Sequence, residues 1–200
     1  MAYNEVSQTI SSTDALNQTS TSEYDEIGRM LKSINPLGQT ISQSQYDTAG
    51  RMLTQTNGVG DSTTFAYDDA GRQTSITDPA GHTSLTSYDS MNRVIQIQDP
   101  LGNFVSYQYD LQGRQTRVID QMLEITDSSY DLIGNMVEQV DAKGNSTFYA
   151  FDNLGRQTSM TDRLSNVTFY EYDRAGRRSK IIDAEGGATL YGFDLSLIHI

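Results

Sequence analysis

The stretch Phe65–Gly81, "FAYDDAGRQTSITDPAG", decides the fold. It holds two clusters that are typical of turns, "DDAG" at Asp68–Gly71 and "DPAG" at Asp78–Gly81, with alternating side chains between them. In the second cluster Asp, Pro and Gly take the first, second and fourth positions that favour a type I turn. In the first cluster, an Asp followed three residues later by Gly suits a type I turn closed by a glycine bulge. The stretch therefore predicts a β-hairpin.

Nearly the same string returns along the whole chain. The aromatic-Asp pair occurs at Tyr24-Asp25, Tyr46-Asp47, Tyr67-Asp68, Tyr88-Asp89, Tyr109-Asp110, Tyr130-Asp131, Phe151-Asp152, Tyr172-Asp173 and Phe193-Asp194. The spacing between the first two pairs, the first step of the repeat, is 22 residues, and every later spacing is 21 residues. Tyr3-Asn4, 21 residues before Tyr24, is a degenerate copy of the pair. Each unit reads Y-D-x-x-G-R, five variable residues, D-P-x-G, then x-x-T-x-Y-x. A fixed period of this length predicts a repeat architecture.

The segments between the turns have the period of a β-strand. Thr147, Tyr149 and Phe151 share one face, and their β-branched and aromatic side chains favour a strand. A second, shorter strand is predicted over Arg72–Thr77, where Thr74 and Ile76 share a face. Each unit is therefore expected to consist of two antiparallel strands and two turns, with no room for a useful helix.

These units predict an all-β fold of repeated 21-residue antiparallel hairpins, covering residues 3–194 in about nine and a half units. Open twisted sheets rarely exceed about ten strands without curling, so we expect a curled or spiral sheet that is part of a larger shell. The tyrosines recur on one face and should form a ladder along it. The 22-residue first step predicts a bulge or longer turn between Gly38 and Tyr46.

The residues that repeat are interpreted as a structural motif. They are Tyr24, Asp25, Gly28, Arg29, Tyr46, Asp47, Gly50, Arg51, Tyr67, Asp68, Gly71, Arg72, Asp78, Pro79, Gly81, Tyr88, Asp89, Arg93, Asp99, Pro100, Gly102, Tyr109, Asp110, Gly113, Arg114, Tyr130, Asp131, Gly134, Phe151, Asp152, Gly155, Arg156, Tyr172, Asp173, Gly176 and Arg177. Two exceptions stand out: Asn92 replaces the first glycine, as Asn can where φ is positive, and Asn135 replaces the arginine. The second turn varies more, with "DQML" at Asp120 and "DRLS" at Asp162.

Composition excludes several classes of partner. The net charge is −12, which argues against nucleic acid because phosphate binding needs a basic face, and against an anionic membrane surface. No apolar run approaches a membrane span, and "MAYNEVSQTISST" lacks the basic and apolar regions of a signal peptide. Cysteine is absent, which removes disulfides and thiolate metal ligands.

No catalytic, cofactor or metal site is predicted. His82 and His199 are the only histidines, and neither has the partners that a general base or a zinc site would need. The repeated Asp residues lack the glycine-paired nonapeptide of calcium solenoids, so we interpret them as turn caps. The Asp25/Arg29 type of pair is expected to form a row of ion pairs with a structural role, each worth about 0–1 kcal/mol if exposed.

The motifs Y-D-x-x-G-R, D-P-x-G and T-x-Y-x-Y resemble the RHS/YD-repeat family, over nearly the whole chain. The resemblance implies hairpins wound into a spiral sheet that forms a hollow shell, as in bacterial RHS proteins, teneurins and insecticidal toxin complexes. In bacterial members the shell encloses a C-terminal toxic domain, and a core region at the end of the shell cleaves it. This chain has neither segment, so it is interpreted as an uncapped fragment.

The expected function follows from this resemblance. The chain is expected to be a structural shell segment of a large RHS-type protein, secreted or at the surface of a bacterium, that encloses or delivers an effector domain. Its partners would be other repeats of the same chain and an enclosed toxin domain. The alternative is a carbohydrate-binding or adhesion module, in which exposed tyrosines stack on surface glycans. The final "LSLIHI", residues 195–200, resembles a translated sequencing adapter and is interpreted as non-native; a divergent apolar tail is the alternative.

Overall fold

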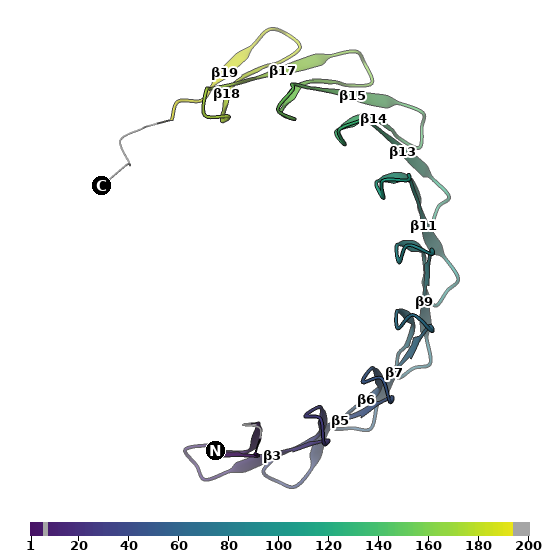
Figure 1. Cartoon of the computed structure of the whole chain (residues 1–200), viewed down its shortest axis with the longest axis vertical. Coiled ribbons are helices and arrows are strands. Elements are labelled where there is room, and N and C mark those ends of the chain that lie inside the picture. Colours follow the sequence, from purple (N-terminus) through teal and green to yellow (C-terminus); the bar gives the residue numbers. More distant parts are fainter. Residues whose placement is uncertain (6–7, 194–200) are drawn as a thin grey trace. The chain divides into compact units, whose positions relative to one another are not determined.

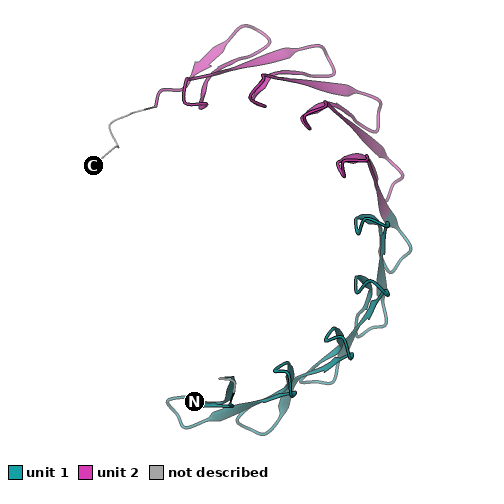
Figure 2. Cartoon of the chain, in the orientation of Figure 1, with its two compact units in different colours: residues 1–104 teal, residues 105–200 magenta. Residues whose placement is uncertain are grey.

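A computed structural model of the chain describes residues 1–5 and 8–193. The expected non-native tail, Asp194 and His199 lie outside these residues. The chain divides into two compact units, Met1–Phe104 and Val105–Ile200, which are coloured separately in Figure 2. Each unit is an array of β-hairpins, and the described residues contain no helix.

The strands follow the repeat (Figure 1). Those of the first unit are β1 (Ala2–Tyr3), β2 (Thr9–Thr13), β3 (Thr19–Tyr24), β4 (Met30–Ile34), β5 (Thr40–Tyr46), β6 (Met52–Asn57), β7 (Ser62–Tyr67), β8 (Gln73–Thr77), β9 (Thr83–Tyr88) and β10 (Val94–Gln98). Strand β11 (Phe104–Tyr109) begins with the last residue of that unit. The second unit continues with β12 (Gln115–Ile119), β13 (Ile125–Tyr130), β14 (Met136–Val140), β15 (Ser146–Phe151), β16 (Gln157–Thr161), β17 (Val167–Tyr172), β18 (Arg178–Ile182) and β19 (Ala188–Leu190).

Two kinds of turn join the strands. The first turn is the Y-D-x-x-G-R turn, such as Asp68–Arg72 between β7 and β8, and the second turn is the D-P-x-G turn, such as Asp78–His82 between β8 and β9. In both, the amide of the fourth residue donates to the Asp carbonyl, from Gly71 over 2.9 Å and from Gly81 over 3.0 Å. These glycines have φ of 83° and 87°, a region that favours glycine.

The ladders across the two turns differ in length. Across a first turn the pairing reaches the turn itself, with Tyr67 opposite Gln73. Across a second turn the pairing of β8 with β9 runs from Thr77 opposite Thr83 only as far as Ser75 opposite Leu85. Gln73 and Thr74 therefore have no ladder partner in β9. Neighbouring hairpins separate at the edge that carries the first turns, and we call the space between two consecutive first turns a joint.

The 22-residue step is accommodated by a bulge, as expected. Opposite β4, Ser33 faces Ser42 and Ile34 faces Thr40, so Ile41 is the extra residue. The bulged backbone lies against Gly58 of the next second turn, where a Cβ would be only 3.0 Å from the Thr40 carbonyl oxygen. The extra residue thus falls between Gly38 and Tyr46 and leaves the later repeats in register.

The described residues form a sheet of a single layer without a core. None of the described residues is buried, and large apolar side chains at turn tips are almost fully exposed, such as Leu101 at 87% and Leu111 at 90%. Within each unit, taken by itself, the row of hairpins curves (Figure 2). The predicted fold class, repeated antiparallel hairpins in a curled all-β sheet, is confirmed. Stability must come from many small repeated contacts, as in other repeat proteins.

Some second turns carry backbone strain because a residue other than glycine takes a positive φ. Leu123 has φ of 64° and Ser165 has φ of 66° at the place of the turn glycine, a region that costs an L-residue about 1–2 kcal/mol. Leu123→Gly is expected to raise the free energy of unfolding by about 0.5–1 kcal/mol, measured by urea denaturation, because strain relief exceeds the added chain entropy. The neighbouring Met122→Gly, at an ordinary φ, is the control and should lower stability; stabilisation by both changes would contradict this account.

Candidate functional site

The repeated first turn holds an ion pair and a cap on one carboxylate. In the turn at Asp68, one carboxylate oxygen accepts from the Arg72 amide over 2.9 Å, and the other accepts from Arg72 Nε over 2.7 Å. Both side chains keep about a quarter of their surface exposed. The Asp side chain therefore fixes the turn and aims the arginine along the edge of the sheet.

The same arginine reaches across the joint to the next repeat. Arg72 donates from Nη1 to the Asp89 carbonyl over 2.8 Å and to Asn92 Oδ1 over 2.9 Å. Its guanidinium carbon lies 4.8 Å from the centre of the Tyr88 ring, a cation–π distance. The Tyr88 hydroxyl donates back to the Gln73 carbonyl over 2.9 Å. We call this arrangement the clasp, and it closes the joint where the strand ladder is absent.

The clasp recurs in both units. The guanidinium carbon lies 4.7–5.0 Å from the ring centre in the pairs Arg29–Tyr46, Arg51–Tyr67, Arg114–Tyr130 and Arg156–Tyr172. The hydroxyl of each of these tyrosines donates to the backbone carbonyl of the residue after the arginine, which is Met30, Met52, Gln115 or Gln157. Arg29, Arg51 and Arg114 also donate to the carbonyl of the next Asp. The clasp is therefore the structural unit of contact between repeats.

The glycine of the first turn lies beside the arginine of the preceding repeat. A Cβ on Gly50, where φ is 88°, would lie 3.2 Å from Arg29 Nη1. At the joint of Arg72 the same place is held by Asn92, with φ of 64°, and its Oδ1 accepts from Arg72. The place therefore requires a positive φ, and it tolerates a side chain that can accept from the arginine.

One joint within the second unit lacks both the arginine and the tyrosine hydroxyl of the clasp. Asn135 replaces the arginine and binds only its own turn, donating from Nδ2 to Asp131 Oδ2 over 2.8 Å. The next aromatic residue is Phe151, which has no hydroxyl to donate to the Met136 carbonyl. Asp131 is the one first-turn Asp of the described repeats that forms no ion pair. The two replacements fall at the same joint.

The hydrogen bonds stabilise the charged form of the turn carboxylates. The side-chain hydrogen bond from Arg72, followed by its backbone amide, lowers the pKa of Asp68 below its ordinary value. The same two bonds from Arg156 lower the pKa of Asp152. In the second turn, hydrogen bonds from the side chain and amide of Asn103 lower the pKa of Asp99 despite some burial. Both kinds of turn therefore favour ionised Asp.

The one remaining candidate residue that the structure describes, His82, contacts the aspartate of its own turn. His82 is exposed, and its Nδ1 lies 3.0 Å from Asp78 Oδ2 in its own turn. Among the described residues, no group of His, Cys, Asp or Glu is placed to hold a metal ion. In the part of the chain that the structure describes, no helix is long and apolar enough to cross a membrane.

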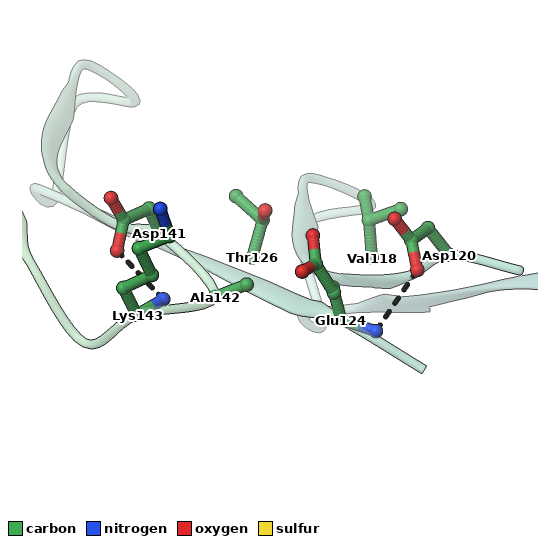
Figure 3. A pocket seen from close by; sticks show the side chains of 7 residues that line it. All are labelled: Val118, Asp120, Glu124, Thr126, Asp141, Ala142 and Lys143. Atoms are coloured by element: carbon green, nitrogen blue, oxygen red, sulfur yellow. Dashed lines mark hydrogen bonds between the residues drawn. The ribbon is translucent and has the colours of Figure 1, made fainter. Parts of the chain in front are cut away.

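A shallow hollow lies between two second turns of the second unit (Figure 3). Its volume is about 280 Å³ and it is lined by Val118, Asp120, Glu124, Thr126, Asp141, Ala142 and Lys143. Its aspartates are occupied in turn capping, since Asp120 accepts from the Glu124 amide and Asp141 from the Lys143 amide, both over 2.9 Å.

The tyrosines fall into two groups with different surroundings. Of those that precede an Asp, Tyr46, Tyr67, Tyr88, Tyr130 and Tyr172 take part in clasps, and Tyr24 donates its hydroxyl to the Thr9 carbonyl. Tyr107, Tyr149 and Tyr170 lie two residues earlier in their strands, opposite Val118, Met160 and Ile181 respectively. Their hydroxyls have no hydrogen-bond partner among the described residues, although Arg178 lies over the Tyr170 ring at 4.3 Å. Unlike the clasp tyrosines, these three residues therefore keep a hydroxyl that is available for hydrogen bonding.

This repeated, clasped hairpin array defines the class of protein. The family model described as Teneurin YD-shell matches residues 1–174, and the chain belongs to this family. No curated protein sequence matches the chain.

Solved structures give the same fold. The chain is similar to a chain in the crystal structure of TcdB2-TccC3 over 90% of its own length, with 18% sequence identity and a TM-score of 0.63. A structure of TcdB2-TccC3 without its hypervariable C-terminal region is similar over 92% of this chain, with 18% identity and a TM-score of 0.50. The chain spans only 12% of the length of either matched chain.

Sequence reasoning missed the reach of the arginine. It predicted the pair of Arg72 with Asp68 but not the contacts of Arg72 with Tyr88 and Asp89, because these depend on how consecutive turns lie side by side. One signal was present: at the one joint where Asn135 replaces arginine, the following tyrosine is also replaced, by Phe151.

The clasp predicts energetic coupling between Arg72 and Tyr88. Tyr88→Phe should lower the free energy of unfolding by about 1 kcal/mol through loss of one hydrogen bond. Arg72→Ala should lower the free energy of unfolding by more than Tyr88→Phe does. Arg72→Lys should lower it by an intermediate amount, since lysine keeps the charge but lacks the planar fork. A double-mutant cycle in urea should give a coupling of about 0.5–1 kcal/mol. Asp69→Asn on the exposed turn tip is the control; strict additivity would argue against the clasp.

The lowered pKa values of the Asp residues predict acid sensitivity. A folded-state pKa below the ordinary value of about 3.9 means that the unfolded chain binds more protons as the pH falls. The stabilisation is therefore fully present above about pH 4 and is lost as the pH falls through the folded pKa values. Unfolding midpoints in urea, measured from pH 7 to pH 3, should drop steeply below about pH 4. A flat profile through that range would contradict the assignment.

Proposed function

We propose that this chain is a stretch of wall in a larger shell-forming protein that encloses or delivers a C-terminal toxic or effector domain. The observation that carries the proposal is a single-layer sheet in which none of the described residues is buried and whose neighbouring hairpins are closed by clasps. Such a sheet exposes both of its faces, which suits a wall better than a pocketed domain. Membership of the YD-shell family supports the same role.

One comparison supports a variable region downstream of the wall. One similar structure is TcdB2-TccC3 without a hypervariable C-terminal region, and we propose an analogous region downstream in the whole protein. The wall would perform no catalysis, because its repeated residues are engaged in turns and clasps. We further propose that the protein is secreted or lies at a bacterial surface. Its net charge of −12 would keep the wall soluble and discourage nucleic acid.

The test is proteolysis of the full-length protein around these repeats. The downstream region should resist a protease in the native protein and be cut quickly when expressed alone. Combining Arg72→Ala with Arg114→Ala should open two joints and increase cleavage, while the control Asp69→Asn should not. Equally fast cleavage of the downstream region in the native protein and in isolation would overturn the enclosing role.

Carbohydrate binding is the second candidate, and one observation favours it at defined residues. Among the described residues, the hydroxyls of Tyr107, Tyr149 and Tyr170 have no hydrogen-bond partner, whereas the hydroxyls of the clasp tyrosines donate to backbone carbonyls. A glycan panel should then give saturable binding that is lost in Tyr149→Ala with the fold retained, while Tyr172→Phe at a clasp leaves binding unchanged. Absence of saturable binding, or loss of the fold in Tyr149→Ala, would leave the wall role alone.

A further inference from the structure

The joint between the first turns at Asp131 and Asp152 keeps the acceptors of a clasp but not its donor. In a complete clasp the guanidinium meets its own carboxylate, the carbonyl of the next Asp and the next aromatic ring, as Arg114 does with Asp110, Asp131 and Tyr130. At the following joint the carboxylate of Asp131, the Asp152 carbonyl and the Phe151 ring are all present. Among the described residues, no cationic side chain contacts any of these three groups.

The shorter Asn135 adds an acceptor to this joint. Its Nδ2 donates to Asp131 Oδ2 over 2.8 Å, so its Oδ1 points the other way. That oxygen accepts no hydrogen bond from the described residues and lies 3.7 Å from where a Cβ on Gly155 would be. At a complete joint, Arg29 Nη1 lies 3.2 Å from the equivalent point on Gly50. Asn135 therefore brings an acceptor to the edge of the space that a guanidinium fills elsewhere.

The Asp131 carboxylate is held in place but not neutralised. One oxygen accepts from the amides of Ile133, Gly134 and Asn135 over 2.8–3.0 Å, and the other from the Asn135 side chain. These donors are all neutral. The Asp152 carbonyl accepts from the Gly155 amide over 2.9 Å and has a second lone pair, which at other joints receives the arginine.

We propose that this joint, which we call the open joint, binds an arginine side chain supplied by another polypeptide segment. The guanidinium would stack on Phe151 and donate to the Asp152 carbonyl and Asn135 Oδ1, with its charge beside Asp131. The planar fork of arginine matches this set of acceptors, whereas the compact ammonium of lysine does not. The joint then becomes a docking point at which a partner completes the clasp in trans.

The test uses the full chain and N-acetyl-arginine amide as the probe, with amide chemical shifts as the readout. Saturable shifts are expected at Gly155 and Phe151 of the open joint, and not at Gly176 and Tyr172 of the neighbouring clasped joint. N-acetyl-lysine amide carries the same charge and should bind at least about tenfold more weakly. This ligand controls for the general attraction of cations to an acidic protein.

Two variants sharpen the test. Asn135→Arg should fill the joint and weaken binding of N-acetyl-arginine amide by at least about tenfold. The combined change Arg156→Asn with Tyr172→Phe copies the open joint one repeat further along, and should create new saturable shifts at Gly176. No saturable shift at Gly155, equal binding of the lysine probe, or unchanged binding in Asn135→Arg would each overturn the proposal.

Discussion

The contact between neighbouring hairpins depends on one side chain, the arginine that ends each first turn. A second turn holds its two strands together only near the turn, and the ladder between β8 and β9 ends at Ser75 opposite Leu85. Beyond that point the backbone offers no further pairing, so side chains must close the edge. Arg72 does so with hydrogen bonds at both ends and with a ring beneath it.

A sheet held in this way needs no hydrophobic core. None of the described residues is buried, and each repeat contacts only its neighbours. The contacts are ionic and partly exposed, so each contributes modestly and is weakened by salt and acid. Their repetition makes the sum large, and the same repetition lets one repeat differ without loss of the fold. The open joint at Asn135 and Phe151 is such a difference.

Much of this architecture could be predicted from the sequence, because both turns carry local signals. Asp78, Pro79 and Gly81 specify their turn by their own conformational preferences, and the 22-residue step located the bulge now seen at Ile41. The turn-capping role of the Asp residues also follows from local chemistry. The clasp could not be predicted in this way, since Arg72 and Asp89 are brought together by the spacing of two successive hairpins. Likewise, the division of the tyrosines into clasp residues and residues with unused hydroxyls depends on contacts that periodicity does not reveal.

The measurement that tests the central claim most directly is native-state hydrogen exchange across the second unit. If arginine clasps close the joints, the amides of Val137 and Ala150 beside the open joint should exchange faster than those of Thr158 and Glu171 beside the clasp of Arg156 with Tyr172. These amides occupy matching positions of consecutive repeats, so local sequence geometry is held constant. Lower protection is expected at the open joint under conditions in which the fold is intact. Equal or greater protection there would show that the joints are held by something other than the clasp.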